Sequence, residues 1–473
     1  MTVAELKELF RECPLVASVQ AGEGSPLDDP NVLLRLAQAS IGEGAQVLRL
    51  QGAENIRTIK SGTGLPVIGL IKRSYPESDV YITPTLKEVE ELLDLGCEVV
   101  ALDGTPRKRG EGWDFAGLVD RIHMAGALAM ADCDSLDSAR WAAGCGADLI
   151  GTTLAGYTTE SAAKVGPDLA LVRELRALGK PVIAEGRFNA RWQIEAALRI
   201  GASAVVVGGA INDPVKQTRA LLPARPPVGN VGAVDIGGTW LRFGVFTSDW
   251  RLVEAERVPN PANREGRIEW IRDRAKAHGV ERLGVSSGGV IDPTNGVCIQ
   301  AKEYLMPDQV GIQFSEETLG LPTFAHGDGH ATAWGHACRP EWAGSRVATL
   351  ALGTGVGCGF VQDGRIWCGK HGEYPRINDL PTSFGKTYEN LLGGINLTTE
   401  PSEDQKRIAI QALEDAVFAI RNLYFPDTLM IAGSVGLSDW IHPELGRLEL
   451  VASPFGTDAG LYGAAALALF PPG

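Results

Sequence analysis

The chain has 473 residues, which is too many for one compact core and predicts two or three domains. Its 44 lysines and arginines against 58 aspartates and glutamates leave a net charge of −14, which disfavours binding to the phosphate backbone of DNA or RNA. Apolar residues make up 44%, so disorder is excluded as the main state. Glycine is over-represented, with 58 residues, which indicates many tight turns and close approaches of the backbone to ligands.

The eight cysteines are scattered and form no Cys-x-x-Cys pair, so the sequence contains neither a disulfide scaffold nor a zinc cluster. The first ten residues carry charges where a signal peptide needs an apolar core. No apolar run reaches the ~20 residues of a membrane span. We therefore expect a cytoplasmic α/β protein with neither membrane nor nucleic-acid partners, and the sequence leaves a homo-oligomer open.

Residues 223–229, Pro-Ala-Arg-Pro-Pro-Val-Gly, form the clearest boundary in the chain. Three prolines in five residues cannot continue a helix and favour an extended connector. We expect one domain over 1–222, a linker over 223–229 and a second domain over 230–473.

Before this linker, short apolar runs alternate with amphipathic, helix-like stretches. There are eight such runs, about 20–33 residues apart, as a repeated strand–helix unit requires. They lie at 15–19, 47–50, 67–71, 99–102, 127–130, 149–151, 182–184 and 204–207. Eight such units predict a closed (β/α)₈ barrel, with an open doubly wound sheet as the alternative.

Polar or glycine residues follow nearly every one of these runs. On a barrel these positions meet at the carboxyl-end mouth, where such enzymes place their active sites. The two glycine-containing loops after the seventh and eighth strands are typical of phosphate binding. The pattern predicts a site of sugar-phosphate size, formed by Gln20, Arg49, Lys72, Asp103, Asp132, Thr152, Thr153, Glu185, Gly208 and Gly209.

Lys72 and Glu185 are the candidate acid/base groups. A lysine partly removed from water can lose its proton near neutral pH and act as a base. Glu185 could exchange a second proton or anchor a hydroxyl group. Two alternatives stay open: an ion pair between the two residues that merely closes the barrel, and a Schiff base on Lys72 in an aldolase.

The first domain resembles the N-acetylmannosamine-6-phosphate 2-epimerases over essentially all of residues 1–222. The similarity lies in the segments 19–21, 69–72, 80–85, 101–105, 131–132, 151–158, 184–187 and 205–209. Single-residue departures occur within 103–105 and 154–156.

This resemblance implies inversion at C2 of a phosphorylated N-acetylhexosamine by removal and return of the C2 proton. Lys72 would be the principal acid/base and Glu185 its partner, and Arg49 would stabilise the enolate oxygen. The remaining contacts would come from Gln20, Arg49, Asp132, Thr153 and Arg187 on the sugar and from Gly208 and Gly209 on the phosphate.

After the linker, three strand–glycine turns recur at wide spacing. The first runs from Asp235 through Gly237, Gly238 and Thr239. It lets backbone N–H groups approach a phosphate, while Asp235 can hold Mg²⁺ through water. The second contains Gly353, Thr354 and Gly355 but no full dinucleotide fingerprint, which argues against a Rossmann site. The third contains Gly433.

Three such turns predict a duplicated, actin-like nucleotide clamp, with three unrelated hairpins as the alternative. Between them lies His326-Gly-Asp328-Gly-His330, ahead of an alanine-rich helix. Asp328 can accept a hydroxyl proton as that hydroxyl attacks a γ-phosphate. The alternative is a metal site formed by His326, Asp328 and His330.

Residues 230–470 resemble the ROK family of sugar kinases, specifically its N-acetylmannosamine kinases. The anchors are Asp235–Thr239, Ser286–Gly289, Gly353–Gly357 and Gly433–Gly436. The resemblance implies ATP and Mg²⁺ as cofactors and Asp328 as the catalytic base, with Glu373 and Glu389 as sugar contacts. ATP would be bound by Asp235, Gly237, Gly238, Thr239, Gly353, Thr354, Gly355 and Gly433.

The sequence departs from the ROK pattern at several positions. Gly327 occupies a position that is usually asparagine, and Arg376 stands where the family has a histidine after its Gly-Glu pair. The zinc-binding cysteine cluster is also missing. We therefore expect no structural zinc, and a loop around 367–390 that is held by packing.

The two resemblances fit one reaction sequence. A kinase that phosphorylates N-acetylmannosamine at O6 makes the substrate that the barrel would epimerise to N-acetylglucosamine 6-phosphate, as in sialic acid catabolism. Two alternatives remain. The second domain could be a sugar-responsive regulator, although a barrel stands where a helix-turn-helix would be needed and the charge disfavours DNA. It could also be a degenerate kinase that serves an active epimerase as a scaffold.

Overall fold

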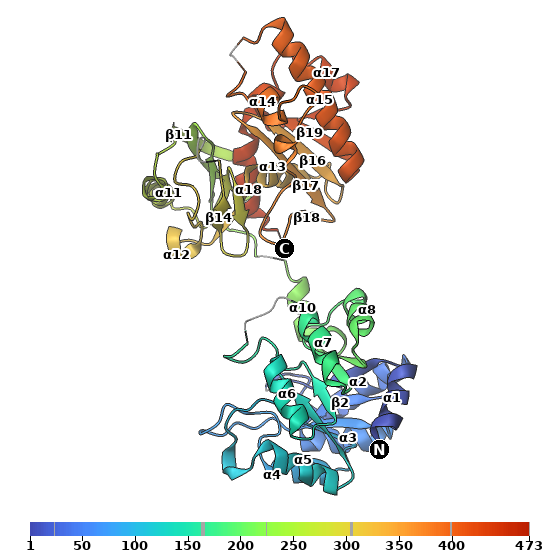
Figure 1. Cartoon of the computed structure of the whole chain (residues 1–473). Helices are drawn as coiled ribbons and strands as arrows, with labels where there is room; N and C mark the ends of the chain where they lie inside the picture. The colour runs from blue at the N-terminus through green and yellow to red at the C-terminus, as the bar shows by residue number, and fades with distance from the viewer. Residues whose placement is uncertain (23, 162–165, 224, 303–305, 398–399, 473) are drawn as a thin grey trace. The chain divides into compact units, whose positions relative to one another are not determined.

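A closed eight-stranded barrel and two five-stranded sheets form the framework of the computed structural model. The structure describes residues 1–473 except 23, 162–165, 224, 303–305, 398–399 and 473 (Figure 1). The chain divides into two units, Met1–Leu222 and Pro223–Gly473. In the described part of the chain, no helix is both long and apolar enough to cross a bilayer.

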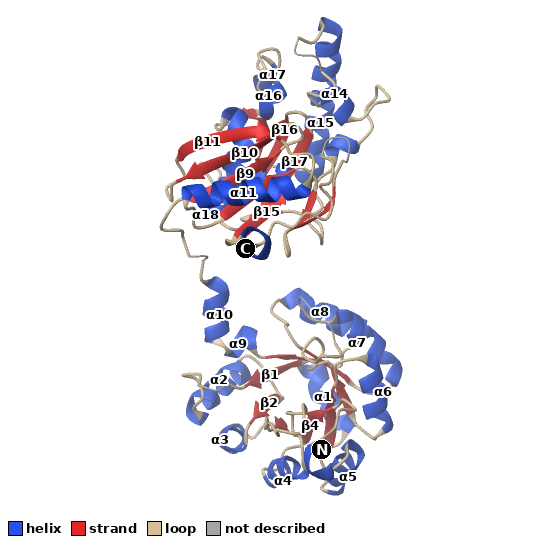
Figure 2. Cartoon of the chain, turned by 90° about the vertical axis from the view of Figure 1, so that its left-hand side faces the viewer, coloured by secondary structure: helices blue, strands red, loops and turns tan. Residues whose placement is uncertain are grey.

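The first unit is the predicted (β/α)₈ barrel, and the open-sheet alternative is wrong. All neighbouring strands are parallel, and β1 pairs with β8 through Ala17 opposite Val207, which closes the ring (Figure 2). The strands are β1 Leu15–Val19, β2 Leu48–Gln51, β3 Val67–Leu70, β4 Val99–Asp103, β5 Leu128–Asp132, β6 Leu149–Gly151, β7 Val182–Glu185 and β8 Ala204–Val207.

Helices surround the barrel, and side chains at the N-cap positions satisfy the first backbone N–H groups of several of them. The Asp29 carboxylate accepts the N–H groups of Asn31 and Val32 at the start of α2, and Thr85 with Glu88 forms a capping box at α4. The helices are α1 Val3–Glu12, α2 Pro30–Gly42, α3 Ala53–Thr63, α4 Leu86–Asp94, α5 Phe115–Met124, α6 Leu136–Gly144, α7 Leu169–Leu175, α8 Arg191–Ile200, α9 Gly209–Asn212 and α10 Pro214–Leu221, with short 3₁₀ turns at Gly110–Gly112 and Arg176–Leu178.

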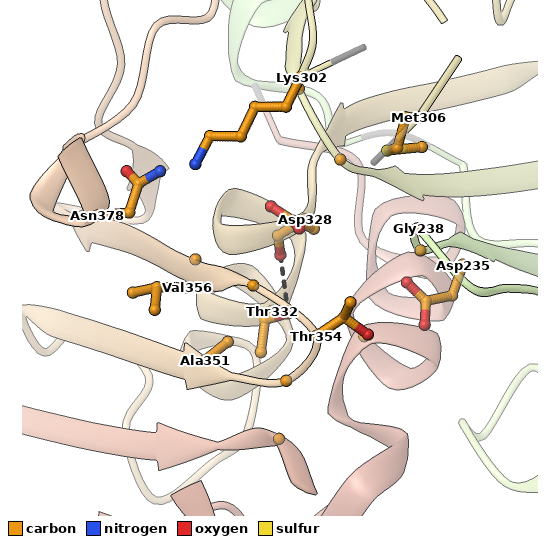
Figure 3. Close-up of a pocket in the computed structure, with 18 of the residues that line it drawn as sticks. Asp235, Gly238, Lys302, Met306, Asp328, Thr332, Ala351, Thr354, Val356 and Asn378 are labelled. Atoms are coloured by element: carbon orange, nitrogen blue, oxygen red, sulfur yellow. Dashed lines mark hydrogen bonds between the residues drawn. The ribbon is translucent and has the colours of Figure 1, made fainter. Parts of the chain in front are cut away.

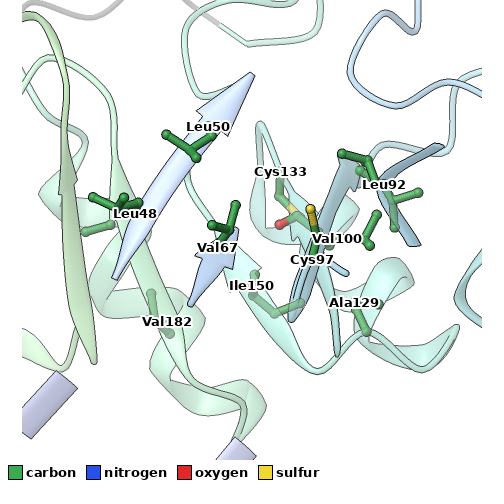
Figure 4. Close-up of a cluster of buried hydrophobic side chains, with 14 of the residues drawn as sticks. Leu48, Leu50, Val67, Leu92, Cys97, Val100, Ala129, Cys133, Ile150 and Val182 are labelled. Atoms are coloured by element: carbon green, nitrogen blue, oxygen red, sulfur yellow. The ribbon is translucent and has the colours of Figure 1, made fainter. Parts of the chain in front are cut away.

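Alternation along β2 explains how a charged side chain comes to lie inside the barrel. Leu48 and Leu50 belong to the core between strands and helices, together with Val67 and Ile150 (Figure 4). Successive side chains of a strand point to opposite faces, so Arg49 points inward. The buried guanidinium of Arg49 must therefore find partners inside the barrel.

The second unit contains two five-stranded sheets with the same strand order. In chain order within each sheet, the strands are arranged 3-2-1-4-5, which confirms the predicted duplicated, actin-like fold. The first sheet contains β9 Val231–Ile236, β10 Trp240–Phe246, β11 Leu252–Pro259, β12 Leu283–Ser287 and β15 Thr323–Gly327. The second contains β16 Val347–Leu352, β17 Val356–Gln362, β18 Arg365–Ile366, β19 Thr428–Ala432 and β20 Val451–Ala452, and a separate hairpin pairs β13 Val290–Asp292 with β14 Val297–Gln300.

Two helices, α13 (Asp328–Ala337) and α18 (Ala459–Leu469), pack against each other in this unit. A Cβ at Gly335 of α13 would come within 2.9 Å of Gly463 Cα of α18, so small residues permit the close crossing. A Cβ at Gly284 of β12 would meet the Ala464 carbonyl oxygen at 1.8 Å, so α18 lies directly on the first sheet. Its burial on nearly every side explains why α18 is apolar all round. The helices are α11 Arg264–His278, α12 Glu316–Leu319, α13 Asp328–Ala337, α14 Tyr388–Leu392, α15 Glu403–Tyr424, α16 Gly433–Gly436, α17 Glu444–Arg447 and α18 Ala459–Leu469, with 3₁₀ turns at Ile377–Asp379 and Gly456–Asp458.

Candidate active sites

The barrel mouth is organised around Arg49. Its Nη2 atom lies 2.6 Å from Asp132 Oδ2, and its Nε atom lies 3.1 Å from Glu185 Oε2, although Nε makes no aligned hydrogen bond. The Thr153 hydroxyl lies 2.5 Å from Asp132 Oδ1 and 3.0 Å from Glu185 Oε2. One guanidinium, two carboxylates and one hydroxyl from β2, β5, β7 and the loop after β6 therefore form a closed network.

The environment of this network raises the pKa values of both Arg49 and Glu185, so Arg49 stays ionised. Burial opposes the charge on Arg49, but Asp132 and Glu185 raise the pKa of the guanidinium above its usual value. Burial raises the pKa of Glu185, with Arg49 acting against the rise and Asp132 adding to it. The Thr152 hydroxyl accepts the Glu185 N–H and donates to its carbonyl oxygen, both at 2.9 Å, which holds the end of β7 in place.

Lys72 lies beside this network, immediately after β3, and does not join it. Its Nζ atom donates to Gln20 Oε1 at 2.8 Å, and Gln20 in turn donates to the Ser18 hydroxyl at 2.7 Å. Lys72 is an exposed residue at the open mouth, yet partial burial of its amine lowers the pKa of Lys72, and the positive charge of Arg49 lowers it further. The described contacts contain no ion pair between Lys72 and Glu185, because the Glu185 carboxylate pairs with Arg49.

Arg187 and the glycine pair after β8 border the same mouth. Arg187 adopts a left-handed backbone with φ of 60°, and its guanidinium donates to the carbonyl oxygens of Gly166 and Ala155 at 2.7 and 2.8 Å. It thus holds the loop after β6. Gly208 lies against β1, where a Cβ would come within 3.3 Å of Ser18 Cβ, and α9 begins at Gly209.

In the second unit, one pocket gathers most of the residues that the sequence singled out (Figure 3). It is lined by residues from the ends of β9, β15, β16 and β19, so all three glycine turns converge there. The predicted residues among its lining are Asp235, Gly237, Gly238, Asp328, Gly353, Thr354, Gly355, Glu389 and Gly433.

Two predicted residues do not line this pocket. Thr239 is exposed at the start of β10, where its carbonyl oxygen accepts the Asn260 N–H at 3.0 Å. Glu373 is exposed, and its carboxylate accepts the backbone N–H of His371 at 2.8 Å. In this structure the Glu373 side chain therefore caps its own loop.

Asp328 is the first residue of α13 and points into the pocket (Figure 3). Its Oδ1 atom accepts the Gly329 N–H at 2.7 Å. Burial raises the pKa of Asp328 to about 6; the Gly329 N–H acts against the rise, and the charges of Asp235 and Glu389 add to it. A carboxylate with this pKa is mostly ionised at neutral pH and can accept a hydroxyl proton.

Gly327, the departure from the ROK pattern, has a steric explanation. A Cβ at this position would lie 2.9 Å from the carbonyl oxygen of Gly289. Asparagine would therefore require the neighbouring turn to move.

Asp235, at the end of β9, is held by cationic and hydroxyl partners. Its Oδ2 lies 3.0 Å from Arg242 Nη2, and its Oδ1 accepts from the Ser286 hydroxyl at 3.2 Å. Burial raises the pKa of Asp235, and Arg242 counteracts the rise. Arg242 also reaches Asp458 at 2.9 Å, which ties β10 to the segment before α18.

Backbone segments pack closely at the glycine turns around this pocket. Gly433 has φ of 87°, and a Cβ there would lie 2.3 Å from the carbonyl oxygen of Leu352. A Cβ at Gly394 would lie 2.7 Å from the Gly353 carbonyl oxygen. Peptide N–H groups of glycine turns are common phosphate ligands, and Mg²⁺ prefers carboxylate oxygens such as those of Asp235. The residues present therefore fit ATP with a divalent cation.

Sequence reasoning missed Lys302, which points into the pocket from the segment after β14 (Figure 3). Its Nζ lies 3.3 Å from Glu389 Oε2 and 3.6 Å from Asp379 Oδ1. Glu389 Oε2 also accepts the Val356 N–H at 3.0 Å. No local pattern around Lys302 signals this position, because its partners lie at least 70 residues away in the sequence.

The loop around 367–390 is held by more than the packing that the sequence led us to expect. Arg376 pairs with Asp379 and donates to Gln300 Oε1 of β14 at 3.3 Å, and Lys302 also reaches Asp379. Ion pairs and a hydrogen bond to the β14 segment thus supplement the buried side chain of Ile377.

The alternative of a metal site at His326, Asp328 and His330 finds no support within the described residues. There, no group of three or more histidine, cysteine, aspartate or glutamate side chains is placed to hold a metal. Burial lowers the pKa of His326 to about 4 and that of His330 to about 3, so both rings are neutral. The His330 ring packs edge-on against Tyr374 at 5.9 Å.

Comparison with known proteins identifies both units. Residues 33–222 match the family model described as "Putative N-acetylmannosamine-6-phosphate epimerase", and residues 231–380 match the ROK family model. A Brucella melitensis protein named bifunctional enzyme NanE/NanK is 32% identical over 499 aligned residues, which cover 96% of each chain. The chain belongs to the NanE/NanK family of bifunctional enzymes.

Solved structures similar to each half are also known. The N-acetylmannosamine-6-phosphate 2-epimerase of Clostridium perfringens is 41% identical, covers 47% of this chain and 96% of its own, and gives a TM-score of 0.45. A ROK family glucokinase of Streptomyces griseus is 20% identical, covers 51% of this chain and 99% of its own, and gives a TM-score of 0.44. Membership of the NanE/NanK family rests on the full-length relative and confirms the epimerase–kinase resemblance of the two halves.

Proposed function

We propose that the chain phosphorylates N-acetylmannosamine at O6 with ATP and then epimerises the product at C2 to N-acetylglucosamine 6-phosphate. Residues 230–473 carry the kinase, residues 1–222 carry the epimerase, and 223–229 join them. The observation that carries the proposal is that each half gathers acid/base groups of its own at one site: Lys72 beside the Arg49 network, and Asp328 among the three glycine turns.

In the epimerase, Lys72 is the base. Its lowered pKa increases the fraction of neutral amine that can remove the C2 proton of the open-chain sugar. The charge that develops on the neighbouring carbonyl oxygen is stabilised by Arg49, whose own partners keep it ionised. Because the enolate is planar at C2, return of the proton to the opposite face inverts that carbon. We propose that the open-chain enolate turns about its C2–C3 bond between the two steps, so that the same Lys72 amine meets both faces of C2. We assign both transfers to Lys72 and the orientation of a sugar hydroxyl to Glu185.

The other contacts of the barrel follow from the placement of the side chains. Gln20 positions the Lys72 amine through their hydrogen bond, and Asp132 and Thr153 hold Arg49 and Glu185 in place. Arg187 orders the loop above the sugar, and the backbone of Gly208 and Gly209 binds the phosphate.

In the kinase, Asp328 accepts the O6 proton as O6 attacks the γ-phosphorus. The O6–P bond forms while the bond to the β–γ bridging oxygen breaks, so ADP is the leaving group. The backbone of the turns at Gly237–Gly238, Gly353–Gly355 and Gly433 holds the phosphates, and Glu389 contacts the sugar. A bound Mg²⁺, held by Asp235, would neutralise phosphate charge.

One incubation tests both steps together. N-acetylmannosamine, ATP and Mg²⁺ are supplied in D₂O, and we expect ADP together with N-acetylglucosamine 6-phosphate that carries deuterium at C2. Asp328→Asn should abolish ADP formation and leave the epimerisation of added N-acetylmannosamine 6-phosphate intact. Lys72→Gln should do the reverse. If the intact protein consumes no ATP with N-acetylmannosamine, the kinase half is a scaffold.

A further inference from the structure

Lys216 of α10 is a cation at the barrel mouth to which neither the sequence analysis nor the proposed mechanism gives a role. Its aliphatic chain lies across Gly209, where a Cβ would come within 3.3 Å of Lys216 Cδ and 3.8 Å of its Nζ. The ammonium group lies 3.3 Å from Asp213 Oδ2, and 71% of the Lys216 side chain is exposed. The charge therefore stands directly beside the glycine pair that follows β8.

The other cations described around this mouth already have partners. Arg49 holds two buried carboxylates, and the Arg187 guanidinium donates to two backbone carbonyl groups. Arg107 pairs with Asp103 at 2.6 Å. Lys72 must be neutral to act as a base, so it cannot also neutralise an anion.

The charge of Lys216 interacts with that of Lys72. Burial is the main cause of the lowered pKa of Lys72, followed by Arg49, and the charge of Lys216 lowers it as well. Gly208 packs against Ser18, whose hydroxyl accepts from Gln20, and Gln20 accepts from Lys72, so the glycine pair and the Lys72 amine lie at the same end of the barrel.

We propose that Lys216 binds the phosphate group of the sugar phosphate at the barrel mouth, together with the backbone of Gly209. This inference rests on the proposed epimerase function. Glycine at 209 lets the lysine chain cross close to the backbone, so that ammonium and peptide groups approach the same anion. The exposed pair with Asp213 is weak, because solvent screens both charges, and Lys216 can exchange it for another anion. A charge-assisted contact with a phosphate dianion is stronger.

The test measures epimerisation of N-acetylmannosamine 6-phosphate by the full chain, without ATP. Lys216→Gln should raise KM about tenfold or more and change kcat less than about threefold, because the phosphate is remote from C2 and is held equally in ground and transition states. Inhibition by inorganic phosphate should weaken by a similar factor. Lys216→Arg should retain most of the affinity, and Lys7→Gln, on the exposed surface of α1, should match the parent.

Asp213→Asn separates phosphate binding from a structural role. Asparagine can still cap α10, where Asp213 Oδ1 accepts the Lys216 N–H at 2.9 Å, but it no longer neutralises the ammonium. If Lys216 acts only through its pair with Asp213, this variant should lose substrate affinity as Lys216→Gln does. If Lys216 binds phosphate, KM should stay constant or fall.

Failure of the epimerase assignment gives a different result from failure of this inference. A parent chain that does not turn over the sugar phosphate contradicts the proposed function, and binding of inorganic phosphate, measured by calorimetry on parent and Lys216→Gln, then decides the role of Lys216. Equal phosphate affinity in the two proteins, or an unchanged KM in an active enzyme, overturns the inference.

Discussion

Arg49 and Asp132 form an ion pair with a 2.6 Å contact between Nη2 and Oδ2, and both side chains are at most 1% exposed. Such a pair is stable only while both partners are present, because removal of one leaves an uncompensated charge inside the protein. The same contact orients the guanidinium that we assign to the enolate oxygen. Loss of the Arg49–Asp132 contact should therefore affect both the stability of the barrel and the orientation of this guanidinium.

Asp132→Asn should destabilise the barrel and stop epimerisation. We expect a loss of about 3 kcal/mol in unfolding free energy, at the lower end of the range for broken buried pairs because Glu185 still faces Arg49. The epimerase kcat should fall at least about a hundredfold. Urea denaturation and the two separate activity assays measure this. Asp137→Asn, at an aspartate with 92% of its side chain exposed, is the control and should leave both quantities unchanged.

Kinase activity should fall as the pH drops through about 6. Asp328 must be ionised to accept the O6 proton, and burial raises its pKa to about 6, so activity rises with pH through that value and levels off above it. The measurement is kcat/KM for N-acetylmannosamine at saturating ATP between pH 5 and pH 8. A profile without an acid limb in this range would contradict the assignment of Asp328 as the base.

Lys302→Gln should move this acid limb to higher pH. The ammonium of Lys302 acts against the raised pKa of Asp328, so its removal raises that pKa further. It also leaves Glu389 without its cation, and KM for the sugar should rise several-fold while KM for ATP changes little. Lys386→Gln, at an exposed lysine outside the pocket lining, is the matched control. Equal changes in both KM values would show that Lys302 only supports the loop.

Gly433→Ala should disrupt the nucleotide end of the pocket. The residue has φ of 87°, and a Cβ would lie 2.3 Å from the Leu352 carbonyl oxygen, so the end of β16 and the turn at Gly353 must shift. We expect a loss of roughly 2–3 kcal/mol in unfolding free energy and a large rise in KM for ATP. Gly344→Ala is the control, because Gly344 has φ of 81° but nothing within 4 Å of a Cβ. It should cost only about 1 kcal/mol of backbone strain and leave ATP binding unchanged.

Local sequence pattern predicted much of the architecture. Apolar runs at strand–helix spacing indicated the barrel, because each run buries one strand and the helices between them must cover it. The three glycine turns indicated the duplicated sheets, since a duplicated clamp brings such distant turns to one ligand. Two strands extend further than the apolar runs predicted. β5 and β7 include Asp132 and Glu185, whose backbone groups still pair with the neighbouring strands.

Sequence alone determined which residues could carry chemistry at the strand ends, because the order of apolar and polar residues dictates where each strand stops. Only the tertiary structure decided which charges meet. The Glu185 carboxylate pairs with Arg49 and not with Lys72. The Glu373 carboxylate accepts a backbone N–H group of its own loop, and Lys302 pairs with Glu389 in the kinase pocket although no local sequence pattern indicates it. Such pairings depend on side-chain direction and on contacts between residues far apart in the chain, which a linear pattern does not encode.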